Sequence, residues 1–153
     1  MFIESPKFGR IQVDEDRVIT FPEGLLGFRE FKRYFFQGPS ADAILVWMQC
    51  VDVPALAFVV IDPRYIKPDY EVKVKSAQLE PIGIGEASRA QVYVILTIPE
   101  DPGKMTANLR GPIVINPETG LGAQIVLNDD TVTTKYPVLE GLQAQGTVVA
   151  GQG

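Results

Sequence analysis

Apolar residues in this chain gather in short runs separated by Pro, Gly and acidic clusters, a pattern that predicts many strands joined by turns. The clearest run is QVYVILTI at residues 91–98, where β-branched and aromatic residues dominate. Residues 43–50 and 56–61 are almost continuously apolar, which favours strands covered on both faces. Weaker patterns predict further strands at residues 2–4, 10–13, 18–21, 71–75 and 131–138.

Two pairs of runs are predicted to form hairpins. Residues 105–127 contain an apolar run, the turn-forming sequence NPETG and a second apolar run, so they predict a strand, a turn and a strand. Residues 10–13 and 18–21 flank the polar sequence DEDR, which predicts a four-residue turn between two paired strands. Both hairpins favour an antiparallel arrangement of strands.

One segment has helical rather than alternating spacing. Phe28, Phe31 and Phe35 stand at i, i+3 and i+7, which predicts a short amphipathic helix over residues 25–35. An aromatic stripe at this spacing is expected to pack on the core rather than to line a groove. Residues 79–89 contain interrupting Pro and Gly and are expected to be irregular.

Chain length and strand number together predict one domain. A chain of 153 residues with 46% hydrophobic and 22% charged residues is large enough for a single core. No repeat or linker divides it, so we expect a mainly β, single-domain, antiparallel β-barrel-like fold over residues 1–140, with one short helix. Closure is favoured because it removes exposed strand edges. Residues 141–153 carry no charge and no period, and are expected to form a mobile tail.

The net charge is −5, because 19 acidic residues outnumber 14 basic ones. Nucleic-acid binding depends on Lys and Arg neutralising phosphates, so this balance disfavours direct binding to nucleic acid. An acidic surface would attract a basic protein, although negative charge also serves solubility alone. No apolar run approaches the roughly 18 residues of a membrane helix, and no export signal is evident, so we expect a cytoplasmic protein.

The chain has no histidine and one cysteine, which excludes the commonest catalytic and metal-binding arrangements. Without histidine there is no Ser-His-Asp or Cys-His pair, and one cysteine supports neither an intramolecular disulfide nor a Cys-based zinc site. Cys50 ends an apolar run and is expected to be a buried hydrophobe. The sequence therefore predicts no catalytic residue, no metal ligand and no cofactor.

Clustered carboxylates keep an enzyme open as an alternative. The clusters are residues 14–16, residues 129–130, and Asp62 with Asp69. The first two stand where turns are expected, and the third rests on sequence proximity alone. A carboxylate-dependent hydrolase would need two of these groups to converge in a cleft with displaced pKa values. The other alternative, a barrel that binds a small ligand, would need an internal apolar cavity.

The remaining polar and aromatic groups suit recognition of a partner. They are Tyr65, Tyr70, Asn108, Arg110 and Gln124, among Asp52, Asp62 and Asp69. Asn108 and Gln124 do not titrate, so they are either ties to the backbone, the favoured interpretation, or recognition groups.

Five separated blocks resemble, in this order, the flagellar assembly factor FliW family. They are FGRIQVDEDRVITFPEGLLGF, LAFVVIDP, PDYEV, NLRGPIVIN and GAQIVL, and they run from Phe8 to Leu127. The resemblance implies a cytoplasmic, non-enzymatic β-barrel-like protein that binds flagellin and, alternatively, the RNA-binding translational repressor CsrA. In that scheme, export of flagellin frees the factor to bind CsrA, which relieves repression of flagellin synthesis.

The resemblance also guides where a partner surface is expected. Acids, tyrosines and amides occur together in the matching blocks, so we expect the surface to be formed by these residues. They are Asp69, Tyr70, Asn108, Leu109 and Gln124, with Asp62 and Tyr65 at the rim.

Overall fold

A computed structural model describes residues 1–38, 43–84 and 89–146 of the chain. The strands are β1 (Phe2–Ser5), β2 (Gly9–Gln12), β3 (Ile19–Thr20), β4 (Arg33–Gln37), β5 (Val46–Cys50), β6 (Ala57–Ile61), β7 (Gln91–Thr97), β8 (Thr106–Ala107), β9 (Ile113–Asn116), β10 (Leu121–Gln124) and β11 (Tyr136–Pro137). The helices are α1 (Ser76–Leu79) and α2 (Val138–Ala144), with shorter 3₁₀ helices η1 (Glu15–Arg17), η2 (Pro63–Tyr65), η3 (Glu80–Ile82) and η5 (Pro102–Lys104).

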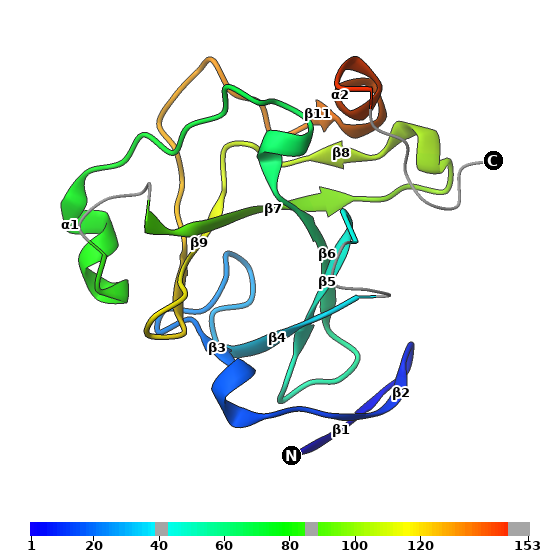
Figure 1. The fold of residues 1–153 in the computed structure, drawn as a ribbon, viewed down its shortest axis with the longest axis vertical. Helices are drawn as coiled ribbons and strands as arrows, with labels where there is room; N and C mark the ends of the chain where they lie inside the picture. Colours follow the sequence, from blue (N-terminus) through cyan, green and yellow to red (C-terminus); the bar gives the residue numbers. More distant parts are fainter. Residues whose placement is uncertain (39–42, 85–88, 147–153) are drawn as a thin grey trace.

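The strands close into a barrel (Figure 1). Neighbouring strands follow the order β7, β6, β5, β4, β3, β10 and β9, and the ring closes where β9 pairs with β7. These pairings are antiparallel except for β3 with β10, which are parallel and meet at the single pair Leu121↔Thr20. Strands β8 and β11 extend the sheet beyond β7, and β1 with β2 forms a separate hairpin. The predicted mainly β, barrel-like fold is confirmed.

The interior of the barrel is filled with side chains. They come from β3, β4, β5, β6 and β9 and from the chain that follows β3, and they form one cluster of contacting residues, so they lie inside the ring: Ile19, Phe21, Leu25, Tyr34, Met48, Cys50, Val60, Ile113 and Ile115. Cys50 is completely buried, as predicted. The loop between β3 and β4 crosses the middle of the barrel in Figure 1, and its Leu25 belongs to this interior cluster.

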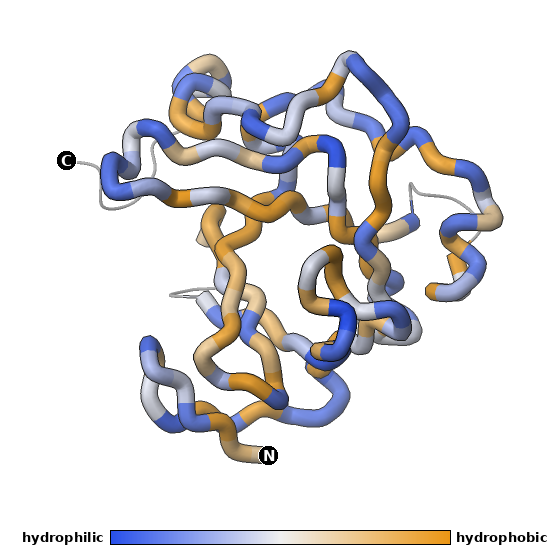
Figure 2. Tube along the Cα trace, turned by 180° about the vertical axis from the view of Figure 1, so that it is seen from behind, coloured by the Kyte–Doolittle hydropathy of each residue, from blue (hydrophilic) through white to orange (hydrophobic). Residues whose placement is uncertain are grey.

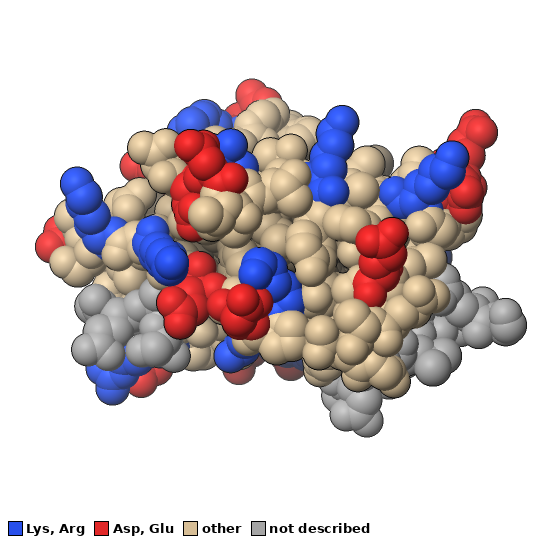
Figure 3. All heavy atoms as spheres, turned by 90° about the horizontal axis from the view of Figure 1, so that it is seen from above, with Lys and Arg blue, Asp and Glu red and all other residues tan. Residues whose placement is uncertain are grey.

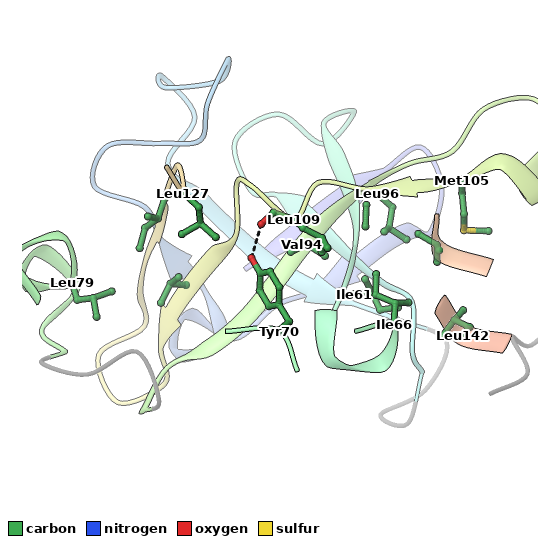
Figure 4. Packing of buried hydrophobic residues seen from close by; sticks show 14 of the residues in the cluster. Ile61, Ile66, Tyr70, Leu79, Val94, Leu96, Met105, Leu109, Leu127 and Leu142 are labelled. Carbon is green, nitrogen blue, oxygen red and sulfur yellow. Dashed lines mark hydrogen bonds between the residues drawn. The ribbon is translucent and has the colours of Figure 1, made fainter. Parts of the chain in front are cut away.

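A second core covers the outside of β7 and β9. Val94 and Val114 point outward from these strands and pack with side chains from the segment after β6, from α1 and from α2. Figure 4 shows this packing, in which Leu79, Tyr70, Ile66 and Leu142 are spread along the layer that covers these strands. In Figure 2, which colours the chain by hydropathy, hydrophobic positions are concentrated on the central strands and hydrophilic ones on the outer turns.

The predicted hairpin of residues 10–13 and 18–21 is wrong in its pairing. Strand β2 pairs with β1, and β3 pairs with β4 and β10. The turn between β1 and β2 is closed by Ser5, whose Oγ accepts hydrogen bonds from the amides of Lys7 and Phe8. Val13, which follows β2, is buried against Ile3 and belongs to a small third cluster. The DEDR sequence forms the 3₁₀ helix η1 instead of a hairpin turn.

The predicted helix over residues 25–35 is also wrong. Gly24 and Gly27 adopt φ values of 67° and 83°, which turn the chain, and a helix cannot run through such positions. Phe35 lies in β4 and packs in the third cluster, whereas Phe28 and Phe31 pack against the interior of the barrel. The expectation that these rings cover a core is therefore confirmed, although the spacing that suggested a helix was coincidental.

Three weaker predictions are corrected in part. Residues 71–75 do alternate between exposed and half-buried positions, but they pair with no strand among the described residues. Of residues 131–138, only Tyr136–Pro137 form a strand. Residues 79–84 contain η3 rather than irregular chain, and residues 85–88 lie outside the described residues.

The expected tail begins inside a helix. α2 continues to Ala144, and its Gly141 and Leu142 are buried against the outer core. The folded part of the chain therefore extends past residue 140. Residues 147–153 lie outside the described residues, and for them the tail stays a prediction.

Candidate functional site

Two of the expected partner-binding residues, Tyr70 and Leu109, are tied to each other inside the molecule. The Tyr70 hydroxyl donates a hydrogen bond of 2.7 Å to the Leu109 carbonyl, the dashed line in Figure 4. Both side chains are buried, and burial raises the pKa of Tyr70. The bond fastens the segment after β6 to the chain before β9.

The side-chain amides of Asn108 and Gln124 both lie next to Gly111. A Cβ on Gly111 would lie 2.9 Å from Asn108 Nδ2 and 3.2 Å from Gln124 Nε2, so the glycine makes room for both. Asn108 Oδ1 accepts a hydrogen bond from the Arg110 amide at 3.0 Å. Gln124 Nε2 donates to the Gly111 carbonyl at 3.0 Å, and its Oε1 accepts from the Leu26 amide at 2.9 Å. The Gln124 side chain therefore ties the β3–β4 loop to β10, whereas the Asn108 side chain closes a turn within its own loop.

The remaining expected residues, Asp62, Tyr65 and Asp69, lie on the segment that follows β6. Asp62 accepts a hydrogen bond from the Arg64 amide and forms an ion pair with its guanidinium at 2.9 Å. Asp69 pairs with Lys67 at 2.9 Å, and its side chain is 80% exposed. The hydrogen bond and the charge of Lys67 lower the pKa of Asp69. Tyr65 is 46% exposed, so this segment presents acids and an aromatic ring to solvent.

The carboxylate clusters do not converge. Asp129 accepts hydrogen bonds from the Thr131 amide and hydroxyl, and these bonds lower the pKa of Asp129. Asp62 and Asp69 each pair with a cation two residues away rather than with another carboxylate. Within residues 1–38, 43–84 and 89–146, no three His, Cys, Asp or Glu side chains stand close enough to hold a metal ion. The hydrolase interpretation is therefore not favoured.

Charges of both signs share the upper face of the molecule. Figure 3 shows Lys and Arg side chains interspersed with Asp and Glu and separated by uncharged residues. The excess of acids is thus not gathered into a single region on this face.

A groove that the sequence did not reveal lies beside β10. It has a volume of about 310 Å³, and its walls come from the β3–β4 loop, from residues 122–126, and from Gln78 and Pro81. Two large apolar side chains in its walls face solvent, Leu26 at 41% and Val126 at 59% exposure. Sequence patterns could not identify it, because Val126 stands in the predicted apolar run of residues 124–127, and such a run does not show which of its residues faces solvent.

The comparisons of this chain with known proteins all identify the same family. The family model described as "FliW protein" matches residues 2–138. The flagellar assembly factor FliW of Natranaerobius thermophilus is 41% identical over 151 residues, which is 97% of this chain and 100% of the relative. Its counterpart in Alkaliphilus metalliredigens is 37% identical, over 94% of this chain and 89% of the relative.

A solved structure agrees with the sequence matches. A crystal structure of the flagellar assembly factor FliW superposes with a TM-score of 0.82 at 33% identity, covering 90% of this chain and 96% of that one.

Among the described residues, no helix has the length and apolar character needed to cross a membrane.

Proposed function

This chain belongs to the FliW family, and from that premise we propose that it is a flagellar assembly factor that binds flagellin and, alternatively, a CsrA-type translational repressor. The observation that carries the proposal is the match along nearly the whole chain, in both sequence and fold, to proteins named flagellar assembly factor FliW. The proposed activity is binding rather than catalysis.

The proposed mechanism is exchange between two protein partners in the cytoplasm. Flagellin occupies the factor while it awaits export. When export removes flagellin, the factor binds the repressor and relieves repression of flagellin synthesis. A protein with a net charge of −5 is suited to a basic RNA-binding partner, because complementary charge speeds association and disfavours wrong partners.

We place the repressor surface on the segment after β6, around Asp62, Tyr65 and Asp69. The ion pairs of Asp62 with Arg64 and of Asp69 with Lys67 are solvent-exposed, and such pairs contribute little to stability. Their carboxylates can therefore exchange these cations for those of a partner. Tyr70 and Leu109 form the support behind this segment. Asn108 and Gln124 hold loops elsewhere, at Arg110 and at Leu26, and are not part of the proposed surface.

The test is calorimetric titration of the purified chain with purified flagellin and with purified repressor. Asp62→Lys with Asp69→Lys should weaken repressor binding by about tenfold or more, because two attractive charges become repulsive. The matched control is Asp14→Lys with Asp16→Lys, which makes the same change in net charge at η1. The control should alter the affinity much less.

Two results would count against these proposals. If the wild-type chain binds neither flagellin nor the repressor, the proposed function is wrong. If both double variants weaken repressor binding equally, the effect is one of net charge, and the placement at Asp62 and Asp69 is wrong.

A further inference from the structure

Strand β10 has one edge that is mostly unpaired. Along its other edge it pairs with β9 through four residues, from Leu121↔Asn116 to Gln124↔Ile113. With β3 it shares the single pair Leu121↔Thr20. β3 ends there because the chain turns away at Pro22, which has no amide hydrogen to donate to a ladder.

The chain beyond β10 stays extended and continues this open edge. The Ile125 amide donates to the Pro112 carbonyl at 2.9 Å, and the Leu127 amide donates to the Arg110 carbonyl at 2.7 Å. Backbone groups of alternate residues in an extended chain point to opposite sides, so the amide and carbonyl of Val126 point away from residues 110–112. No acceptor for the Val126 amide is found in the described part of the chain. The edge therefore offers backbone groups for pairing.

This edge forms one side of the groove beside β10. The β3–β4 loop stands across from it and is fixed there, because the Leu26 amide bonds to the Gln124 side chain rather than to the strand backbone. Gly24 lets the loop fold closely on itself, because a Cβ at this position would collide with the backbone of Arg29. The groove thus stays open, with the exposed Leu26 and Val126 in its walls.

We propose that this groove binds an extended segment of flagellin, which pairs as an added strand with the open edge at Gln124 and Val126. Only an extended backbone presents donors and acceptors at the spacing of a strand edge, and alternate apolar side chains of such a segment would cover Leu26 and Val126. The inference rests on the proposed function.

The charges of the groove give no reason to place the basic repressor there. Its walls contain Glu23 and Arg29, one acid and one base, so they offer no net attraction to a basic protein. Asp62 and Asp69 do not line the groove. The two partners are therefore assigned to different surfaces.

Val126→Pro is the sharpest test, because it removes the amide hydrogen at the open edge without breaking a hydrogen bond between described residues. We expect it to weaken flagellin binding, measured by calorimetry on the full chain, by about tenfold or more. Val126→Ala keeps the amide hydrogen and should therefore lose less affinity for flagellin than Val126→Pro does. Repressor binding by Val126→Pro should equal that of the wild type.

A second variant guards against a proline that disturbs the fold. Leu26→Asp leaves the Leu26 amide, and hence its bond to Gln124, in place but puts a charge in the apolar wall; it should also weaken flagellin binding by about tenfold. The control is Ile98→Asp, since Ile98 is similarly exposed at 45% but lies outside the groove. Circular dichroism melting would confirm that each variant is folded.

The outcomes separate the groove from the proposed function. If the wild-type chain binds flagellin and both Val126→Pro and Leu26→Asp bind it equally well, the groove inference is overturned and the proposed function stands. If the wild type does not bind flagellin, flagellin binding is wrong and the groove inference fails with it. Self-association that Val126→Pro abolishes would make a second copy the occupant and overturn the assignment to flagellin.

Discussion

Two buried tyrosines should respond with opposite signs to replacement by phenylalanine. Tyr34 lies inside the barrel with its ring 5.5 Å from that of Phe21, and its hydroxyl has no hydrogen-bond partner within the described residues. The Tyr70 hydroxyl donates to the Leu109 carbonyl at 2.7 Å. Tyr34→Phe therefore removes a buried hydroxyl that makes no hydrogen bond within the described part of the chain to compensate for its loss of hydration. Tyr70→Phe instead leaves the Leu109 carbonyl without its hydrogen-bond donor.

The sizes of the two effects follow from these surroundings. A buried polar group without a partner costs roughly 1–3 kcal/mol. Because Tyr34→Phe keeps the ring and its packing, we expect the free energy of unfolding to rise by about 1–2 kcal/mol. Tyr70→Phe should lower it by about 1–3 kcal/mol, since the Leu109 carbonyl becomes unpaired. The melting temperatures of the two variants should differ by roughly 5–15 °C for a chain of this size.

The assay is urea denaturation at pH 7, followed by circular dichroism, with Tyr65→Phe as the control because the Tyr65 side chain is largely exposed. The slope of the free energy against urea should be equal in all variants, so that midpoints report stability. A Tyr34→Phe variant less stable than the wild type would refute the reasoning, because it would mean that the hydroxyl has a stabilising partner. A neutral Tyr70→Phe would refute the tie to Leu109.

Two further predictions concern alkaline pH and α2. Burial raises the pKa of Tyr34, Tyr70 and Tyr93, so the folded protein keeps protons that the unfolded chain releases above its tyrosine pKa of about 10. The free energy of unfolding should therefore fall as the pH rises from about 10, and it should fall less steeply in Tyr34→Phe. Urea titrations from pH 9 to 12 measure this, and a free energy of unfolding that stays constant over that range would contradict the prediction. Gly141→Ala should destabilise the fold by about 1–3 kcal/mol in thermal melts, because its Cβ would lie 2.7 Å from the Ile66 Cβ, and this overpacking outweighs the helix preference of Ala. An increase in melting temperature would show that α2 does not pack on Ile66 in this way.

Strands whose sequence is apolar throughout were predictable from pattern alone. Strands β5, β6, β7 and β9 lie within predicted runs, because residues covered on both faces leave few other options for a short β-branched segment. The second strand of the hairpin, β10 at Leu121–Gln124, begins earlier than the apolar run predicted at residues 124–127. The false helix at residues 25–35 arose where three aromatic residues happened to have helical spacing. There the positive φ values of Gly24 and Gly27 decided the conformation.

The candidate site was only partly predictable, because the sequence shows which residues are present but not which of them reach solvent. Asp62, Tyr65 and Asp69 are at least partly exposed, whereas Tyr70 and Leu109 are buried against each other. The groove at Leu26 and Val126 left no signal in the pattern of residues.

By itself the sequence determined the mainly β class, the resemblance to the FliW family, and a composition with no histidine and a single cysteine. These follow from local spacing and residue content, which do not depend on how the chain folds back on itself. Only the tertiary structure decided the closure of β9 on β7, the bond between Tyr70 and Leu109, and the open edge at Val126. Each depends on contact between segments far apart in the chain, as between Leu26 and Gln124, 98 residues apart, and such contacts are selected by packing rather than by local pattern.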